Sequence, residues 1–325
     1  MGGILRSSRV RTTVSSLFQA MQGTLGVNIT PSHFYFPIPQ LKSFDGKDWS
    51  ECHACAAVNF RLDEQEKRLD AEVLPFSAEW NFPLHRNGDR HQFHFNNGFF
   101  ERVDAEVAYS LVRSRKPRRI VEVGSGNSTL LLTTAIRKNA AEGFPCELIS
   151  IEPHPAPFLT DGLPGLTQLI AGPVQKAPIE LFRTLRANDI LFIDSSHVVS
   201  IDSDVVYVCL RVLPELAPGV LVHFHDIFAP LEYPEKFVKT NLCFWGEQYM
   251  LQAFLAFNSE YRVLWAGSAM QQYRFERLRS AFPAWDGSFA AMPGSLKGFV
   301  PSKDGDRVWP CSFWIERMRE TMCAA

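Results

Sequence analysis

Short apolar runs alternate along most of the chain with segments that can form helices. Continuous apolar runs rich in β-branched residues are typical of strands buried on both faces of a parallel sheet. Their alternation with helices favours right-handed crossovers between neighbouring strands. The expected strands lie at residues 120–123, 146–151, 166–170, 189–193, 220–224 and 262–265, with a seventh at 312–315. The pattern therefore predicts an α/β protein with a doubly wound, mostly parallel sheet.

Outside these runs, the chain divides into helices, an N-terminal extension and an insertion. Helical spacing of apolar positions predicts helices at residues 61–74, 99–114 and 247–257. Residues 1–98 are irregular and rich in aromatic side chains, and we expect them to form an extension or cap packed on a domain of residues 99–325. The segment 267–310 is rich in proline and glycine, which favours an insertion over a regular element.

The first expected strand ends in a glycine turn that leads into a helix. Gly124 and Gly126 let the backbone turn sharply and approach a ligand closely, and the polar residues 127–129 can cap the helix. Such a combination is a nucleotide-binding element. Thr129 stands where a dinucleotide-binding G-x-G-x-x-G motif has its third glycine, which disfavours a dinucleotide. Glu122 would repel a pyrophosphate, whereas it suits a cationic ligand such as a sulfonium.

Polar side chains gather where the expected strands end. Six charged or imidazole side chains follow apolar runs at these ends: Glu122, Glu152, Asp194, His197, His225 and Asp226. In open α/β sheets, ligands bind outside the carboxyl ends of the strands. The occurrence of six such residues at strand ends is much less expected by chance than the occurrence of one. The sequence therefore predicts a binding site at this edge of the sheet.

The glycine turn and two of these strand ends resemble a known enzyme family. Residues 122–126, E-V-G-S-G, resemble motif I (E/D-x-G-x-G) of the class I, Rossmann-like S-adenosylmethionine (SAM) methyltransferases. The runs L-F-I-D-S-S-H and V-H-F-H-D resemble the D-x-x-H and H-D motifs of bacterial small-molecule methyltransferases, which are distantly similar to the sugar O-methyltransferases of the macrolide pathways. The resemblance implies seven strands with the last one antiparallel, SAM as cofactor, and methyl transfer to a small molecule at a hydroxyl oxygen.

The resemblance also implies which residues bind the cofactor. Glu122 and the glycine turn would hold the methionine part, Glu152 the ribose hydroxyls, and the region of Gly172 the adenine. The full set expected to bind SAM is Glu122, Gly124, Ser125, Gly126, Ser128, Glu152, Gly172 and Asp194.

Two mechanisms for activating the acceptor follow from the same motifs. His197 is the first choice as general base, because D-x-x-H places it beside Asp194 and the ordinary histidine pKa of about 6.5 suits proton abstraction near neutral pH. His225 is the second, with Asp226 orienting it. In the resembled family, carboxylates at these positions hold magnesium. Here His225 replaces one acid, and nitrogen suits magnesium poorly, so a divalent metal on Asp194, His225 and Asp226 and a metal-free site both stay open.

The composition narrows the partners and the compartment. The chain has 325 residues, 46% of them hydrophobic and 21% charged, with a formal net charge of −2. This charge forces no basic face, so we expect no nucleic-acid partner. No apolar run approaches the roughly 18 residues that a membrane span needs. We expect a cytoplasmic enzyme with a small-molecule acceptor, and homo-oligomerisation stays open.

Two other function classes stay open. One is an NAD-linked oxidoreductase on a similar sheet, which Glu122 and Thr129 both disfavour. The other is a non-catalytic binding protein that keeps the fold, which the fold alone does not exclude. Sugar, phenol, peptide side-chain and amine acceptors also stay open, because acceptor pockets come from the unpatterned N-terminal segment and the loops.

Overall fold

The protein forms two compact units in a computed structural model, which describes residues 8–28, 37–49, 51–52, 55, 57–285 and 310–318. The smaller unit comprises Met1–Lys47 and Lys236–Phe244. Its described part includes the helix α1 (Ser8–Leu25) and the 3₁₀ turn η2 (Leu41–Phe44). The larger unit comprises Asp48–Glu235 and Trp245–Ala325 and contains the whole sheet, so residues 48–98 are part of the same compact unit as the sheet.

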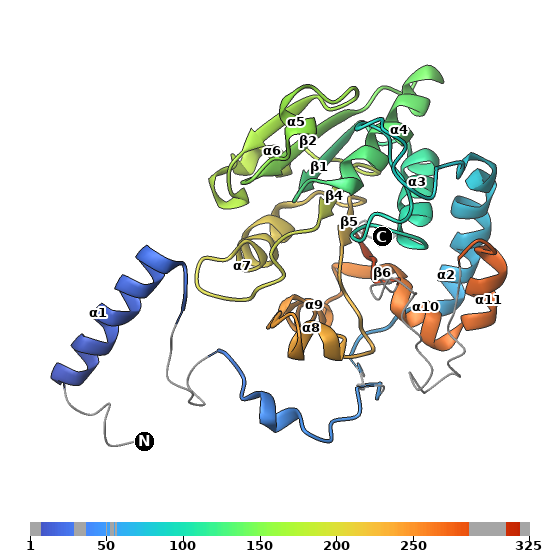
Figure 1. The fold of residues 1–325 in the computed structure, drawn as a ribbon. Coiled ribbons are helices and arrows are strands. Elements are labelled where there is room, and N and C mark those ends of the chain that lie inside the picture. The colour runs from blue at the N-terminus through green and yellow to red at the C-terminus, as the bar shows by residue number, and fades with distance from the viewer. Residues whose placement is uncertain are drawn as a thin grey trace, which may run out of the picture. The chain divides into compact units, whose positions relative to one another are not determined.

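The larger unit is built on one seven-stranded sheet (Figure 1). Its strands are β1 (Arg119–Val123), β2 (Glu147–Glu152), β3 (Gln168–Ala171), β4 (Ile190–Ile193), β5 (Leu221–Phe224), β6 (Tyr261–Ala266) and β7 (Phe313–Arg317). The spatial order is β3-β2-β1-β4-β5-β7-β6. The first five strands run parallel, and β7 lies antiparallel between β5 and β6. The predicted Rossmann-like sheet with an antiparallel last strand is confirmed.

The topology fixes where a ligand can bind. The strand order changes direction between β1 and β4, because β2 and β3 lie on one side of β1 while β4 and β5 continue on the other. Ligands of doubly wound sheets bind outside the carboxyl ends of the strands at such a switch point. The carboxyl ends of β1 and β4 are followed by Gly124 and Asp194, so the glycine turn and the D-x-x-H motif meet there.

Helices and short turns precede the first strand and connect the later ones. They are α2 (Leu62–Arg68), η3 (Leu69–Val73), η4 (Leu74–Glu79), α3 (Asp104–Arg115), α4 (Asn127–Ala141), α5 (Pro157–Thr160), η5 (Val174–Lys176), α6 (Ile179–Arg183), α7 (Asp204–Tyr207), η6 (Val208–Val212), η7 (Leu213–Glu215), α8 (Glu235–Lys239), α9 (Glu247–Leu255), α10 (Gly267–Tyr273) and α11 (Phe275–Ala281).

Three of the predicted segments differ in detail. The helix expected at residues 61–74 is α-helical only to Arg68 and continues as a π turn and then a 3₁₀ turn that contains Pro75. The helix expected from residue 99 begins at Asp104. The segment 267–310 opens with α10 and α11. Its residues 286–309 lie outside the described part of the chain.

Alternation of side chains along each strand produces two apolar layers. Ile120 of β1 points into a layer that packs α3, α4, α10 and α11 on one face of the sheet. Val121, the next residue, points into a layer that packs α6, α7 and α9 on the opposite face. Both layers are buried. Polar side chains can therefore meet a ligand only where the strands end.

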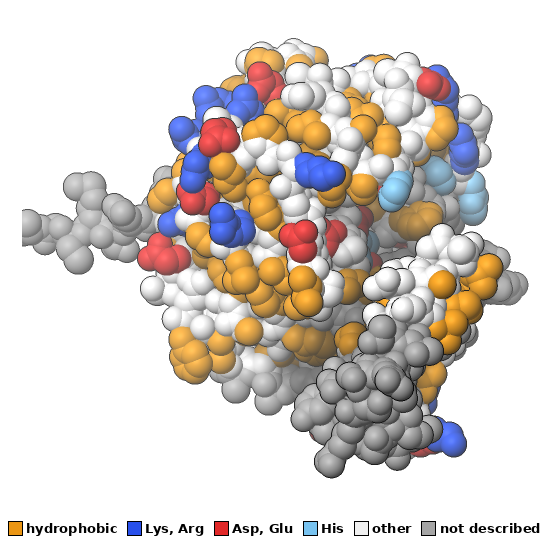
Figure 2. All heavy atoms as spheres, turned by 90° about the vertical axis from the view of Figure 1, so that its left-hand side faces the viewer, with side chains coloured by type: hydrophobic (Ala, Val, Ile, Leu, Met, Phe, Trp, Pro, Cys, Tyr) orange, Lys and Arg blue, Asp and Glu red, His pale blue; other side chains and the backbone are white. Residues whose placement is uncertain are grey.

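The surface shows no preference for one sign of charge on the face drawn in Figure 2, where lysine and arginine side chains are interspersed with aspartate and glutamate. Among the described helices, none is both long enough and apolar enough to cross a membrane.

Candidate active site

The glycine turn after β1 lies directly against the end of β4. Gly124 has a φ of +80°, and a Cβ built on it would lie 1.7 Å from the backbone oxygen of Asp194. Its backbone N–H donates to the carbonyl of Ile151 at 3.0 Å. Only glycine fits this position, since any side chain would collide with a neighbouring strand end. The turn therefore brings the ends of β1, β2 and β4 together.

Glu122 has a different position from the one predicted. Its side chain is fully buried, and its oxygens accept hydrogen bonds from the hydroxyls of Ser128 (2.8 Å), Thr129 (2.8 Å) and Ser150 (2.7 Å). Burial raises the pKa of Glu122 to about 7, although these hydroxyls favour its charged form. Glu122 does not line the cavity described below, so it ties β1, β2 and α4 together beneath the turn instead of facing a ligand.

Thr129 explains why a third glycine is not needed here. Its hydroxyl donates to Glu122 and accepts from the backbone N–H of Gly126 at 3.0 Å. It therefore caps the start of α4 from the position that a dinucleotide-binding motif gives to glycine. The sequence showed the substitution but not this pair of hydrogen bonds.

Glu152, at the end of β2, supports the turn and also reaches the cavity. Its Oε2 accepts from the backbone N–H of Ser125 at 3.0 Å and its Oε1 from that of His154 at 2.8 Å. Each carboxylate oxygen has a second acceptor position. Glu152 can therefore accept hydrogen bonds from a ligand without giving up those that hold the loop.

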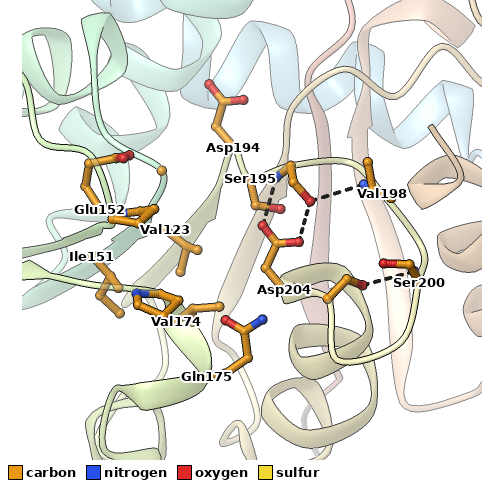
Figure 3. A pocket seen from close by; sticks show the side chains of 15 residues that line it. Val123, Ile151, Glu152, Val174, Gln175, Asp194, Ser195, Val198, Ser200 and Asp204 are labelled. Atoms are coloured by element: carbon orange, nitrogen blue, oxygen red, sulfur yellow. Dashed lines mark hydrogen bonds between the residues drawn. The ribbon is translucent and has the colours of Figure 1, made fainter. Parts of the chain in front are cut away.

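A cavity of about 520 Å³ opens at the ends of the first four strands (Figure 3). Its walls are Val123, Gly124, Ile151, Glu152, Pro153, Pro173, Val174, Gln175, Asp194, Ser195, Ser196, Val198, Ser200, Ser203 and Asp204. The size is that of an ordinary small-molecule site. The residues that line it include three carboxylates and no lysine, arginine or histidine. The cavity therefore favours a ligand with positive charge.

The predicted cofactor residues fall into two groups. Gly124, Glu152 and Asp194 line the cavity. The others lie beside or beneath it, and these are Glu122, Ser125, Gly126, Ser128 and Gly172. Gly172 immediately precedes the lining residue Pro173, at the end of β3. The other twelve lining residues were not predicted as site residues, and several of them lie in loops that have no motif, among them Val174, Gln175, Ser196 and Asp204.

The loop after β4 closes one side of the cavity. Asp204, the first residue of α7, accepts hydrogen bonds from both the backbone N–H and the hydroxyl of Ser196. Ser203 caps α7 by accepting from the N–H of Val206, and it also accepts from Ser200. These bonds hold the loop as one wall, which Figure 3 shows with Asp204 and Ser200 below Asp194.

Asp194 also belongs to a cluster of ionisable side chains. Its Oδ1 lies 3.6 Å from Nε2 of His197, which in turn lies 3.5 Å from Oδ2 of Asp226. Nδ1 of His197 lies 2.8 Å from Oε2 of Glu247. His197 and Asp226 have φ values of +60° and +54°. Such conformations are strained for residues other than glycine and persist where the surroundings impose them, as in active sites.

The protonation of this cluster differs from the sequence-based expectation for a general base. Burial opposes a charge on His197, but its hydrogen bond to Glu247 and the charges of Glu247, Asp226 and Asp194 raise its pKa to about 9. Burial also opposes the charge of Asp194, but His225 and His197 hold the pKa of this carboxyl at about 2. In this arrangement His197 carries a proton at neutral pH, whereas the expected base had an ordinary pKa.

His225 lies deeper than predicted. It is 3% exposed, and its Nδ1 lies 3.6 Å from Oδ1 of Asp194 and 3.8 Å from Oδ1 of Asp226. Its Nε2 faces Asp104 and Cys311, away from the cavity. The structure therefore brings the predicted metal set Asp194, His225 and Asp226 close together. Among the described residues, however, Asp194 and Asp226 converge within 4.8 Å with His197, whereas His225 converges with Asp104 and Cys311.

Sequence reasoning missed Glu247 and Trp245 in this cluster. The Trp245 ring lies 4.6 Å from the His197 ring, and the carbonyl of His197 accepts from the backbone N–H groups of Gly246 and Glu247. The helix predicted at residues 247–257 includes Glu247, but the prediction assigned this side chain no role in the site. No motif marks Glu247, because its role comes from the docking of α9 on the D-x-x-H loop.

Comparison with known proteins agrees with this geometry. Residues 121–227 match a family model described as a methyltransferase domain, a range that runs from β1 past the end of β5. An uncharacterized protein of Archaeoglobus fulgidus is 26% identical over 188 residues, which cover 55% of this chain and 84% of that protein.

Two solved structures also align with the chain. One is an O-methyltransferase from Bacillus cereus in complex with SAH, at 13% identity and a TM-score of 0.38, covering 94% of this chain and 97% of that one. The other is a putative methyltransferase from Thermobifida fusca, at 13% identity and a TM-score of 0.27, covering 84% of this chain and 97% of that one.

The sheet order and the glycine turn are those of a Rossmann-like fold, and residues 121–227 match a methyltransferase domain. The chain therefore carries a methyltransferase domain on a Rossmann-like sheet.

Proposed function

We propose that the enzyme transfers the methyl group of SAM to a hydroxyl oxygen of a small molecule that binds beside Asp194. The observation that carries this proposal is the double position of Asp194, which lines the cavity and also belongs to the cluster with His197 and Asp226. A donor in the cavity and an acceptor at the cluster would meet at this residue. Methyl transfer needs this contact, because the reacting carbon and oxygen must approach in line.

The charge of the cavity supports SAM as its ligand. SAM supplies an electrophilic methyl group on a sulfonium and carries an ammonium group, so its methionine part suits a site lined by Glu152, Asp194 and Asp204. The same carboxylates would repel the pyrophosphate of a dinucleotide. Glu152 would accept hydrogen bonds from the ribose hydroxyls, as an acid at the end of the second strand commonly does.

The cluster suits a divalent metal in its donor atoms and in their support. Two carboxylate oxygens and one imidazole nitrogen converge from Asp194, Asp226 and His197. Glu247 holds the other nitrogen of the ring, which is the usual support of a metal-bound histidine. This mixed set suits a transition metal that accepts nitrogen better than it suits magnesium. Such an ion would lower the pKa of an acceptor hydroxyl bound to it.

The residues around the cluster would then position the acceptor. The side chains of Asp194 and Asp226 are 27% and 14% exposed, so an acceptor can reach the cluster at these two carboxylates. Trp245 covers the His197 ring and would exclude water from it. The alternative is a metal-free mechanism in which His197 itself takes the acceptor proton, which requires a pH near or above its raised pKa of about 9.

Binding measurements test the proposal before the acceptor is known. Calorimetric titration should show SAH binding, and Mn²⁺ titration followed by electron paramagnetic resonance should show one bound ion that Asp226→Asn weakens. With a panel of sugars and phenols as acceptors, SAH release should stop when a chelator is added while SAH binding persists. Turnover that survives the chelator but falls by about 10²–10⁴-fold in His197→Ala would favour the metal-free base. A protein that binds NADH and ignores SAH would overturn the proposal.

A further inference from the structure

A second cluster lies behind the first, and the chemistry proposed above does not use it. Asp104 at the start of α3, His225 after β5 and Cys311 before β7 are 2%, 3% and 0% exposed. The three residues come from segments more than 80 positions apart in sequence. Three chemically different donors meet at one buried point, although a core of this size could be filled with apolar side chains at lower cost.

The spacing of the donor atoms is that of metal ligands. Cys311 Sγ lies 3.6 Å from His225 Nε2 and 3.6 Å from Asp104 Oδ2, and these last two atoms are 3.7 Å apart. A direct hydrogen bond between nitrogen and oxygen is about 2.7–3.2 Å long. In a tetrahedral zinc site, bonds of about 2.0–2.3 Å place the ligand atoms roughly 3.3–3.6 Å from one another. The nitrogen–oxygen edge is too long for a hydrogen bond, the two sulfur edges have the length of S–H hydrogen bonds, and all three edges together fit three ligand atoms around one ion.

A buried oxygen without a partner points to the same conclusion. Asp104 Oδ2 accepts from the backbone N–H of Cys311 at 2.9 Å, but Oδ1 of the same carboxylate is buried and has no hydrogen-bond partner among the described residues. Leaving such an atom unsatisfied costs free energy, and its usual partner is a water or an ion, so a cation shared by both oxygens of Asp104 would account for it. Asp226 Oδ1 lies 3.3 Å from Cys311 Sγ, which places a further carboxylate oxygen at the cluster.

We propose that Asp104, His225 and Cys311 bind a zinc-type divalent ion. The donor set of one sulfur, one nitrogen and one oxygen selects such an ion over magnesium and calcium, which prefer oxygen alone. The ion would fasten α3 to the ends of β5 and β7. It would also steady Asp226, which presents Oδ1 to this cluster and Oδ2 to His197. The site does not depend on the acceptor or on the metal proposed for the first cluster.

Cobalt substitution tests the site without an activity assay. A Co²⁺–thiolate bond gives a charge-transfer absorbance in the near ultraviolet, which oxygen and nitrogen ligands do not produce. The protein would be expressed in minimal medium with Co²⁺ in place of Zn²⁺, so that the ion is present while the buried site forms. We expect this absorbance in the wild type and its loss in Cys311→Ser.

Matched variants separate this site from other thiols and from the first cluster. Cys55→Ser removes a half-buried thiol whose Sγ lies 3.1 Å from Gln252 Oε1, and Glu247→Gln alters the first cluster through His197 Nδ1, so both should keep the absorbance. Asp104→Asn should lower it and is the second variant if Cys311→Ser does not fold. Absence of the band from the wild type would overturn the proposal, as would a band that persists in Cys311→Ser or that disappears in Cys55→Ser.

Discussion

Glu247 Oε2 lies 2.8 Å from His197 Nδ1, and both side chains are buried although 50 positions separate them in sequence. The backbone N–H groups of Gly246 and Glu247 also donate to the His197 carbonyl. The first turn of α9 thus fixes both the ring and the backbone of His197. With Nδ1 engaged by the carboxylate, Nε2 is the atom that faces Asp194 and Asp226, so Glu247 determines which nitrogen serves the site.

Replacing Glu247 tests this positioning role. Glu247→Gln keeps the shape of the side chain but removes its charge, so the tautomer of His197 is no longer imposed. We expect Mn²⁺ affinity to fall by about 10–100-fold, the usual loss when a supporting carboxylate is removed, with SAH affinity unchanged. Mn²⁺ titration and SAH calorimetry on the same samples measure the two effects. Glu180→Gln, whose side chain is 70% exposed on α6, is the control, and equal Mn²⁺ binding in both variants would contradict the role.

The tight packing at the glycine turn gives a second prediction. Gly124→Ala should lower the free energy of unfolding by at least about 2 kcal/mol, because its φ is strained for alanine and its Cβ would overlap the Asp194 carbonyl. SAH affinity should fall at least tenfold, since the backbone of Asp194 must move. Denaturant unfolding and calorimetry measure both. Gly23→Ala is the control, because its Cβ would meet nothing within 4 Å and the residue lies outside the cavity, and similar losses in the two variants would contradict the argument.

The strands and the edge where the site lies could be predicted from the sequence because their signals are local. An apolar run followed by glycine or an acid is visible in a few residues, and parallel strands bring their ends to one edge. Gly124, Glu152 and Asp194 were found in this way and line the cavity. The seventh strand was marked by the short apolar run after residue 311, and its antiparallel direction was implied by the family resemblance.

The contacts behind that edge could not be predicted, because they join distant segments. Glu247, Asp104 and Cys311 have no motif around them, and only the docking of α9, α3 and β7 brings them to the strand ends. The position of Glu122 was also beyond the sequence. Its spacing before the glycine turn suggested a ligand contact, but three hydroxyls from α4 and β2 surround its carboxylate instead.

The environment of Glu122 predicts a dependence of stability on pH. Burial raises the pKa of Glu122 to about 7 in the folded protein, from an ordinary value near 4.5. The folded state therefore binds this proton more tightly than the unfolded state does. Its contribution to the free energy of unfolding is complete below about pH 4.5 and is lost as the pH rises through 7, by up to about 3 kcal/mol.

Glu122→Gln isolates this effect, since glutamine stays neutral. The stability of the wild type relative to Glu122→Gln should therefore decline between about pH 5 and pH 8, as measured by denaturant unfolding at each pH. Glu180→Gln, exposed on α6, should show no such trend against the wild type. A constant difference between the wild type and Glu122→Gln across this range would mean that the carboxyl is already ionised at pH 5.

Glu152 gives the last prediction, because it serves both the loop and the proposed ribose site. Its two oxygens accept hydrogen bonds from the backbone N–H groups of Ser125 and His154. The carboxylate also lines the cavity, where its remaining acceptor positions are available to a ligand. Glu152→Gln replaces a charged acceptor by a neutral amide, and charge-assisted hydrogen bonds are roughly twice as strong as neutral ones. We expect SAH and SAM to bind about tenfold more weakly, which corresponds to about 1.4 kcal/mol, and calorimetry measures this. Asp161→Asn, which removes an exposed ion pair with Arg90 outside the cavity, should leave both affinities unchanged. If Glu152→Gln folds normally and binds SAH as tightly as the wild type, the ribose does not bind at the end of β2.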